Sequence, residues 1–183
     1  PVASVAAADP GEEGEREAKT EADSASLVWR RYLPTEKKCL ADSPEQLAVL
    51  QFLEPYAGTT FIPAEGPTVQ KNQQDFEQID FETAQRIHVT QWKDAGKVLI
   101  EAIEFPDHRK LLRRYHSSEK VSEVMVTESN GSSRSITLSE MGDIENVTVN
   151  AHSRVVSFDY GRDGCVDQIF EGHAQTQAAR EQD

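Results

Sequence analysis

The chain has 183 residues, 37% of them hydrophobic, and a net charge of −13. This length predicts one domain with a core of its own. A chain so acidic is repelled by phosphate backbones, so we expect no nucleic-acid binding. No apolar run reaches the length of a membrane-spanning helix, so we expect no transmembrane segment.

Residues 1–26 are rich in Ala, Glu and Gly, lack aromatic residues, and hold seven acidic residues against two basic ones. Such a segment buries too little apolar surface to offset its ordering entropy, so we predict a disordered acidic arm. An acidic arm suits a basic groove on a partner. The opening Pro-Val-Ala-Ser-Val-Ala-Ala-Ala fits either removal of a targeting peptide, with export or delivery to an organelle, or an engineered start. The compartment itself stays open.

Two helices are expected near the start of the predicted domain. Residues 27–33 place aromatic and apolar side chains at helical spacing and predict a short helix that ends at Pro34. Residues 43–54 predict a more regular one, with Ser43 as the N-cap, Pro44 at the first helical position and Gln46 completing a capping box. Pro55 is expected to end it. Its expected apolar face consists of Leu47, Leu50, Phe52 and Leu53, with Val49 at the margin.

The rest of the chain is dominated by strand signals. Residues 75–85 fit a short helix or a sheet-edge segment, and alternation begins at residue 86. From there, strands and turn clusters repeat about every ten residues to residue 170, which is typical of an antiparallel meander with seven or eight strands. We therefore predict an α+β domain over residues 27–172, in which a helix packs on a long, curved or partly closed antiparallel sheet. Residues 173–183 are expected to form a flexible tail.

Catalytic and metal-binding motifs are missing from the sequence. It has no nucleophile elbow, no glycine-rich phosphate loop, and no His or Cys pair at metal-ligand spacing, so we expect no cofactor and favour a non-enzymatic protein. Asp159, Asp163 and Asp167 fit either a calcium site or turn chemistry, and we favour the turn. The sequence leaves open whether Cys39 and Cys165 form a disulfide.

Two residue sets are candidate binding sites. Arg109, Lys110, Arg113 and Arg114 belong to the one basic cluster, which fits an anion site or a docking face for an acidic partner. We favour the simpler interpretation, a solvated strand face paired with carboxylates such as Glu101 and Glu123. Five aromatic residues of the sheet either line an apolar cavity or fill the core under a helix: Trp92, Phe105, Phe158, Tyr160 and Phe170.

Two triplets, Asn130-Gly131-Ser132 and Asn146-Val147-Thr148, match the N-glycosylation acceptor pattern. The second lies inside a predicted strand. Because such triplets often arise by chance, they receive little weight from sequence alone.

The segments Gly142–Thr148, Ser153–Tyr160 and Asp163–Ile169 together resemble the Tyr-Asp repeats of bacterial RHS-type shell-forming and wall-associated proteins. Those repeats are β-hairpins that assemble into extended sheets. The resemblance spans residues 142–169, and the order here is Asp159-Tyr160, the reverse of the Tyr-Asp order in the repeats. The element order, helices first and then a long meander, is also similar to periplasmic lipoprotein carriers, which implies a curved sheet that holds acyl chains.

We therefore expect a non-enzymatic binding or assembly module, an accessory subunit of a larger complex or envelope structure, which attaches to a protein partner through an exposed edge strand and the acidic arm. The alternative is a carrier of an apolar ligand, a lipid or acyl chain, inside the sheet. A third is an enzyme whose site the sequence does not reveal.

Overall fold

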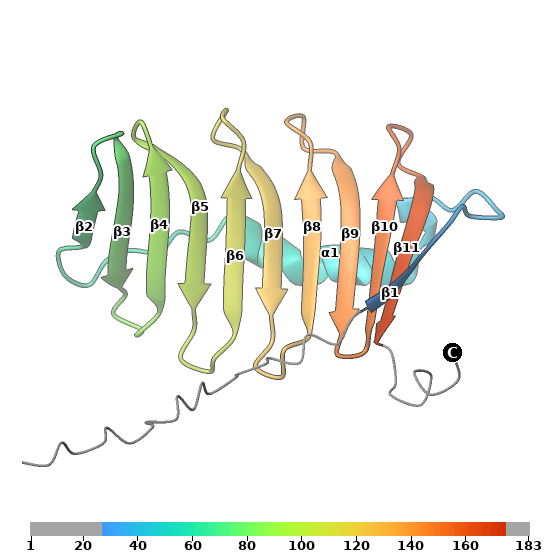
Figure 1. Ribbon diagram of the computed structural model, residues 1–183, viewed down its shortest axis with the longest axis horizontal. Coiled ribbons are helices and arrows are strands. Elements are labelled where there is room, and N and C mark those ends of the chain that lie inside the picture. The colour runs from blue at the N-terminus through green and yellow to red at the C-terminus, as the bar shows by residue number, and fades with distance from the viewer. Residues whose placement is uncertain (1–26, 175–183) are drawn as a thin grey trace, which may run out of the picture.

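The computed structural model describes residues 27–174, which form one large antiparallel sheet with a single α-helix on one face (Figure 1). The predicted disordered arm, residues 1–26, lies outside the described residues, as do residues 175–183 of the predicted tail. The last strand reaches Ala174, two residues beyond the expected end of the domain.

The elements follow one another along the chain in a simple order. A first strand is followed by a 3-10 turn, one α-helix and ten further strands. They are β1 (Leu27–Tyr32), η1 (Leu40–Asp42), α1 (Pro44–Ala57), β2 (Thr68–Lys71), β3 (Phe76–Glu82), β4 (His88–Asp94), β5 (Lys97–Glu104), β6 (Lys110–Tyr115), β7 (Val121–Thr127), β8 (Ser133–Leu138), β9 (Ile144–Ala151), β10 (Arg154–Tyr160) and β11 (Val166–Ala174).

Strands β2 to β11 are neighbours in space in the same order as in sequence, and β1 pairs beside β11. Every neighbouring pair is antiparallel, so the predicted meander is confirmed. Tight turns make this path feasible. Between β4 and β5, Ala95 and Gly96 both have positive φ, 47° and 80°, as a two-residue hairpin turn of the favoured twist requires. The sheet does not close, because β1 and β2 form separate edges.

Three expectations about the elements were wrong. Residues 27–32 form strand β1 and no helix, because pairing with β11 outweighs a weak local helical spacing. Of the two alternatives for residues 75–85, the helix is wrong: residues 76–82 form strand β3, which belongs to the sheet but lies second from its edge. The meander begins at β2, earlier than residue 86, and its ten strands exceed the predicted seven or eight. Strand β2 has only Val69 as an apolar residue, so its pairing with β3 left no periodic signal to detect.

Helix α1 starts at Pro44 as predicted, but the capping contact of Ser43 and the last residue of the helix differ from expectation. The Ser43 hydroxyl makes no capping bond to the helix and donates to the Cys39 carbonyl at 2.9 Å instead. The helix runs past Pro55 to Ala57. Proline removes one backbone donor, and the packing of Tyr56 against Phe52 and Phe105 holds the last turn in place.

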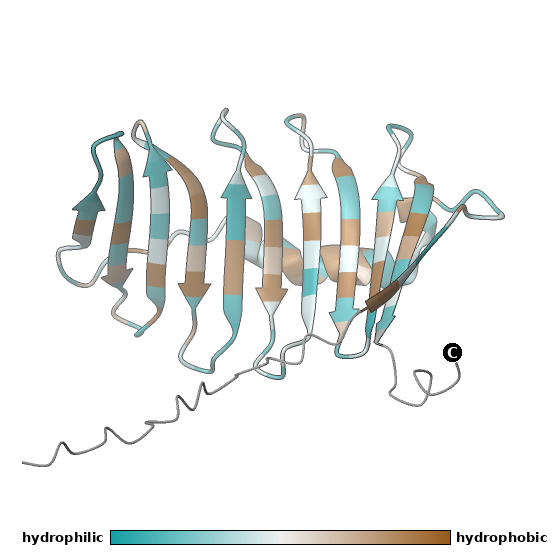
Figure 2. Ribbon diagram, viewed as in Figure 1, coloured by the Kyte–Doolittle hydropathy of each residue, from teal (hydrophilic) through white to brown (hydrophobic). Residues whose placement is uncertain are grey.

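The core lies between α1 and the face of the sheet that is turned away from the viewer in Figure 1. Val49 and Leu53 are the buried helix residues, so Val49 lies at the centre of the apolar face and not at its margin. They belong to one core cluster with buried residues of the sheet, and Figure 2 shows apolar and polar bands along the strands that contribute to it. The buried sheet members of this core are Phe81, Val89, Ile103, Leu111, Val124, Val126, Ile136, Val147, Tyr160 and Val166.

The opposite sheet face is turned to the viewer in Figure 1, where β1, the end strand beside β11, crosses in front of β10 and β11. The protein is mostly β. The expected packing of a helix on an antiparallel meander is right, but the described residues contain one α-helix and the sheet is open.

Candidate functional site

A row of polar residues crosses the helix-side face of three neighbouring strands. Register pairs Gln91 of β4 with Glu101 of β5, and Glu101 with Arg113 of β6. Gln91 Nε2 donates to Glu101 Oε2 at 2.8 Å, and Arg113 Nη2 lies 2.9 Å from Glu101 Oε1. The Tyr115 hydroxyl also donates to Glu101 Oε1. One carboxylate thus accepts hydrogen bonds from three side chains.

The Glu101–Arg113 pair is buried, with side chains only 6% and 4% exposed. Removing one member of such a pair strands a charge in the interior and costs about 3–5 kcal/mol. Burial, and then the bond to Glu101, raises the pKa of Tyr115 well above its usual value, so its hydroxyl stays protonated and donating.

Arg113 also holds the segment that follows α1. Its Nη1 donates to the backbone carbonyls of Tyr56 and Thr59, and its guanidinium lies 5.4 Å from the centre of the Phe61 ring. A cavity of about 330 Å³ adjoins the cluster beneath this segment. Arg113 Nε is buried without a hydrogen-bond partner. Because Arg113 joins the Glu101 carboxylate to the backbone of residues 56–59, we interpret the cluster as an anchor for the C-terminal end of α1.

The four predicted basic residues do not form one patch, because alternate residues of β6 point to opposite faces. Arg109 and Arg113 lie on the helix side, whereas Lys110 and Arg114 lie on the open face. Arg109 donates to the Tyr56 hydroxyl and to Asp107, each at 2.7 Å, and this bond lowers the pKa of the Asp107 carboxyl. Arg114 pairs with Glu123 at 3.1 Å.

The five predicted aromatics are also divided between the two faces. Phe105, Phe158 and Tyr160 pack on the helix side, while register places Trp92 and Phe170 on the open face. They therefore cannot line one cavity together. The Tyr160 hydroxyl is buried without a hydrogen-bond partner, and burial raises the pKa of this residue to about 12.

An apolar groove runs between the N-terminal half of α1 and strands β8 to β10. Its volume is about 470 Å³, and Val49, Val149, Val156 and Phe158 line it together with Arg134 and Arg154. A second hollow of about 450 Å³, which shares Phe158, continues it toward β11. These volumes lie within the range of small-molecule sites.

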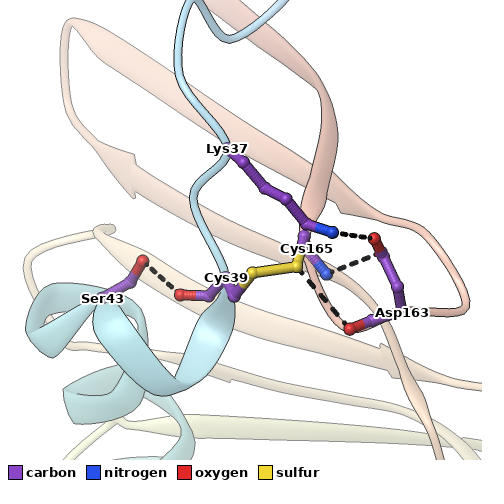
Figure 3. The surroundings of a disulfide bond; sticks show 5 residues. All are labelled: Lys37, Cys39, Ser43, Asp163 and Cys165. Carbon is purple, nitrogen blue, oxygen red and sulfur yellow. Dashed lines mark hydrogen bonds and ion pairs between the residues drawn. A yellow bond between two sulfur atoms is a disulfide. The ribbon is translucent and has the colours of Figure 1, made fainter.

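A disulfide joins Cys39, just before η1, to Cys165, just before β11, which answers the question of pairing that the sequence left open (Figure 3). Backbone bonds flank it on both sides, from Leu40 N to Gly164 O at 2.9 Å and from Val166 N to Lys38 O at 2.8 Å. The start of α1 is therefore fastened to the β10–β11 turn.

The three aspartates around that turn do not converge. Asp163 pairs with Lys37 at 3.0 Å, and Asp159 accepts from Asn146 at 2.6 Å. Asp167 lies against Gly161, where a Cβ would come within 2.6 Å of its Oδ2. Among the described residues no cluster of His, Cys, Asp or Glu could hold a metal ion.

The two edges of the sheet differ. In β1 and just after it, apolar side chains are exposed: 42% for Val28, 54% for Trp29 and 65% for Leu33. Trp29 lies over Gly172 of β11, where an added Cβ would meet the indole ring at 3.1 Å. Strand β2 has only four residues and ends at Lys71, which pairs with Glu77 at 3.0 Å. Short length and a terminal lysine discourage edge pairing, so β1 is the more receptive edge.

Strand β1 is held to β11 by side chains as well as by the ladder. The Tyr32 hydroxyl donates to Glu171 Oε2 at 2.7 Å, and Arg154 and His173 contact the other carboxylate oxygen. The bond from Tyr32, followed by that from Arg154, lowers the pKa of the Glu171 carboxyl.

No protein-family model and no curated protein matches the chain. The resemblances to Tyr-Asp repeats and to lipoprotein carriers therefore stay predictions. Within residues 27–174, no helix combines the length and apolar character needed to span a membrane.

Proposed function

We propose that the protein is a non-enzymatic binding module that attaches to a larger assembly by accepting an extended, acidic segment of a partner along the free edge of β1. The observation that carries this proposal is the exposed edge itself. Among the described residues β1 pairs only with β11, so its outer backbone groups are available for a further strand.

The side chains of β1 indicate the chemistry of the partner. Val28 and Trp29 offer apolar contacts, while Arg30 and Arg31 add two positive charges in the middle of the strand. A second copy paired edge to edge would bring the arginines of both strands close together, and like charges disfavour such pairing. An acidic strand with alternate apolar residues complements both features.

Binding of short probe peptides tests the proposal. We expect full-length protein to bind an eight-residue peptide that alternates Glu and Val, and to ignore the matched Lys-Val peptide. Arg30 and Arg31 lie on opposite faces of β1, so the Glu face of the peptide meets only one of them. Replacing both arginines by glutamate (R30E/R31E) should therefore remove one attractive contact and add one repulsive contact, about 1 kcal/mol in all, or a factor of about 5 in affinity.

The control is K71E, which makes the same kind of change at the β2 edge and should leave the affinity unchanged. Equal binding of the acidic and basic peptides would contradict the proposal, as would an R30E/R31E variant that binds as well as the parent.

The groove beneath α1 favours a second candidate function, a carrier of a single-chain apolar ligand. Its apolar lining and the adjacent Arg134 and Arg154 suit an acyl chain with an anionic head. Native mass spectrometry of freshly purified protein should then show an added lipid mass that V156E removes. Protein that carries no added mass, and does not take up a fluorescent fatty acid, would contradict this second function.

A further inference from the structure

Two acceptor triplets for N-linked sugars are present in the chain, and the structure places them in very different surroundings. Asn130 lies in the turn between β7 and β8, whereas Asn146 lies within β9. The two sites can therefore be compared for their ability to carry a bulky sugar, which requires a surface loop.

The β7–β8 turn is open. Asn130 is exposed, and a Cβ added at the neighbouring Gly131 would meet no heavy atom within 4 Å. The Asn130 Oδ1 accepts hydrogen bonds from the backbone N and the hydroxyl of Ser132, at 2.9 and 2.7 Å. Neither bond uses Nδ2 of Asn130, the atom to which a sugar is attached. Both bonds hold Ser132, whose hydroxyl the acceptor pattern requires, against Asn130.

The second triplet is already engaged in the sheet. Asn146 Nδ2 donates to Ser157 Oγ at 2.7 Å and to Asp159 Oδ1 at 2.6 Å. The Thr148 hydroxyl donates to Asn146 Oδ1 at 2.7 Å. A sugar on this nitrogen would disturb those bonds and place a large group against strand β10.

The disulfide supplies an independent observation about the compartment. Both cysteines of the chain are paired, and disulfides form and persist in the oxidising compartments through which secreted proteins pass. N-linked sugars are added to asparagines of secreted proteins. The disulfide and the exposed acceptor triplet are thus both features of proteins that mature along the secretory route.

We propose that Asn130, and not Asn146, is a site of N-linked glycosylation. In the reaction, Nδ2 of Asn130 bonds to the anomeric carbon of an oligosaccharide held on a lipid pyrophosphate. The bond from that carbon to the phosphate breaks, the pyrophosphate leaves with its electron pair, and the amide nitrogen gives up one proton. In the sheet order, β8 to β11 separate this turn from β1, so a sugar here leaves the β1 edge free.

The test is secretion of the full chain from eukaryotic cells, followed by mass spectrometry of peptides before and after enzymatic removal of N-linked sugars. We expect most Asn130 peptides to carry a sugar and Asn146 peptides to carry none. N130Q and S132A should each abolish the modification, whereas S132T, which keeps the hydroxyl, should retain it.

A secreted, disulfide-bonded chain that is unmodified at Asn130 would overturn the proposal. Modification of Asn146 at a level equal to that of Asn130 would also overturn it, because the structural distinction between the two sites would then be wrong.

Discussion

Removal of the Cys39–Cys165 bridge is the perturbation whose magnitude follows most directly from the structure. The bridge spans 126 residues of sequence. In the chain-entropy description, a closed loop of that length takes about 16 cal/mol/K from the unfolded chain, or about 5 kcal/mol at 25 °C. Because reduced chains retain some structure, we expect a loss of about 3–5 kcal/mol in the free energy of unfolding.

For a domain of about 150 residues, whose entropy of unfolding is about 0.3 kcal/mol/K, this loss corresponds to a fall in Tm of about 10–15 °C. The assay is thermal unfolding followed by circular dichroism, with and without reductant. The double variant C39A/C165A serves as the control, since it should melt near the reduced parent and ignore the reductant.

The position of the bridge adds a local expectation. It fastens the start of α1 to the start of β11, so amide exchange should accelerate there before it does in β4 to β6. Reduced parent protein, shown by alkylation to have two free thiols, that melts within about 2 °C of the oxidised form would refute this reasoning.

Three further predictions concern single groups. Y160F removes a buried hydroxyl that lacks a partner, so it should raise the free energy of unfolding by about 1 kcal/mol in denaturant titrations, and a loss would contradict the assigned environment. R113M leaves the buried charge of Glu101 without its partner and should lower the free energy of unfolding by about 3–5 kcal/mol. The double variant R113M/E101L should recover part of that loss, and losses that simply add would contradict a coupled pair. The pKa of Glu171 is lowered in the folded state, so its contribution to stability is complete above its ordinary value of 4.5 and is lost as the pH falls through the lower, folded value. Exchange of β1 amides, corrected for intrinsic rates, should therefore accelerate in acid, and E171Q should abolish that pH dependence.

The elements that could be predicted from the sequence are those whose signals are local. Pro44 marks the start of α1, and the turn residues divide the meander from β4 onward, because each strand pairs with its neighbour in sequence. Strand β1 was missed because its partner, β11, lies at the other end of the chain.

The candidate sites depended on long-range placement for the same reason. Glu101 and Arg113 are recognisable as neighbours on adjacent strands, but their burial follows from the segment around Thr59, which lies over them. No feature of the local sequence predicts that contact. The pairing of Cys39 with Cys165 is likewise a consequence of β11 returning to the start of the domain.

The central claim, that β1 accepts an acidic strand, is tested most directly by hydrogen exchange of the full chain with and without the alternating Glu-Val peptide. The claim predicts that the peptide protects amides of residues 27–32 and leaves those of β2, residues 68–71, unchanged. Protection confined to other strands, or none at a saturating peptide concentration, would contradict it.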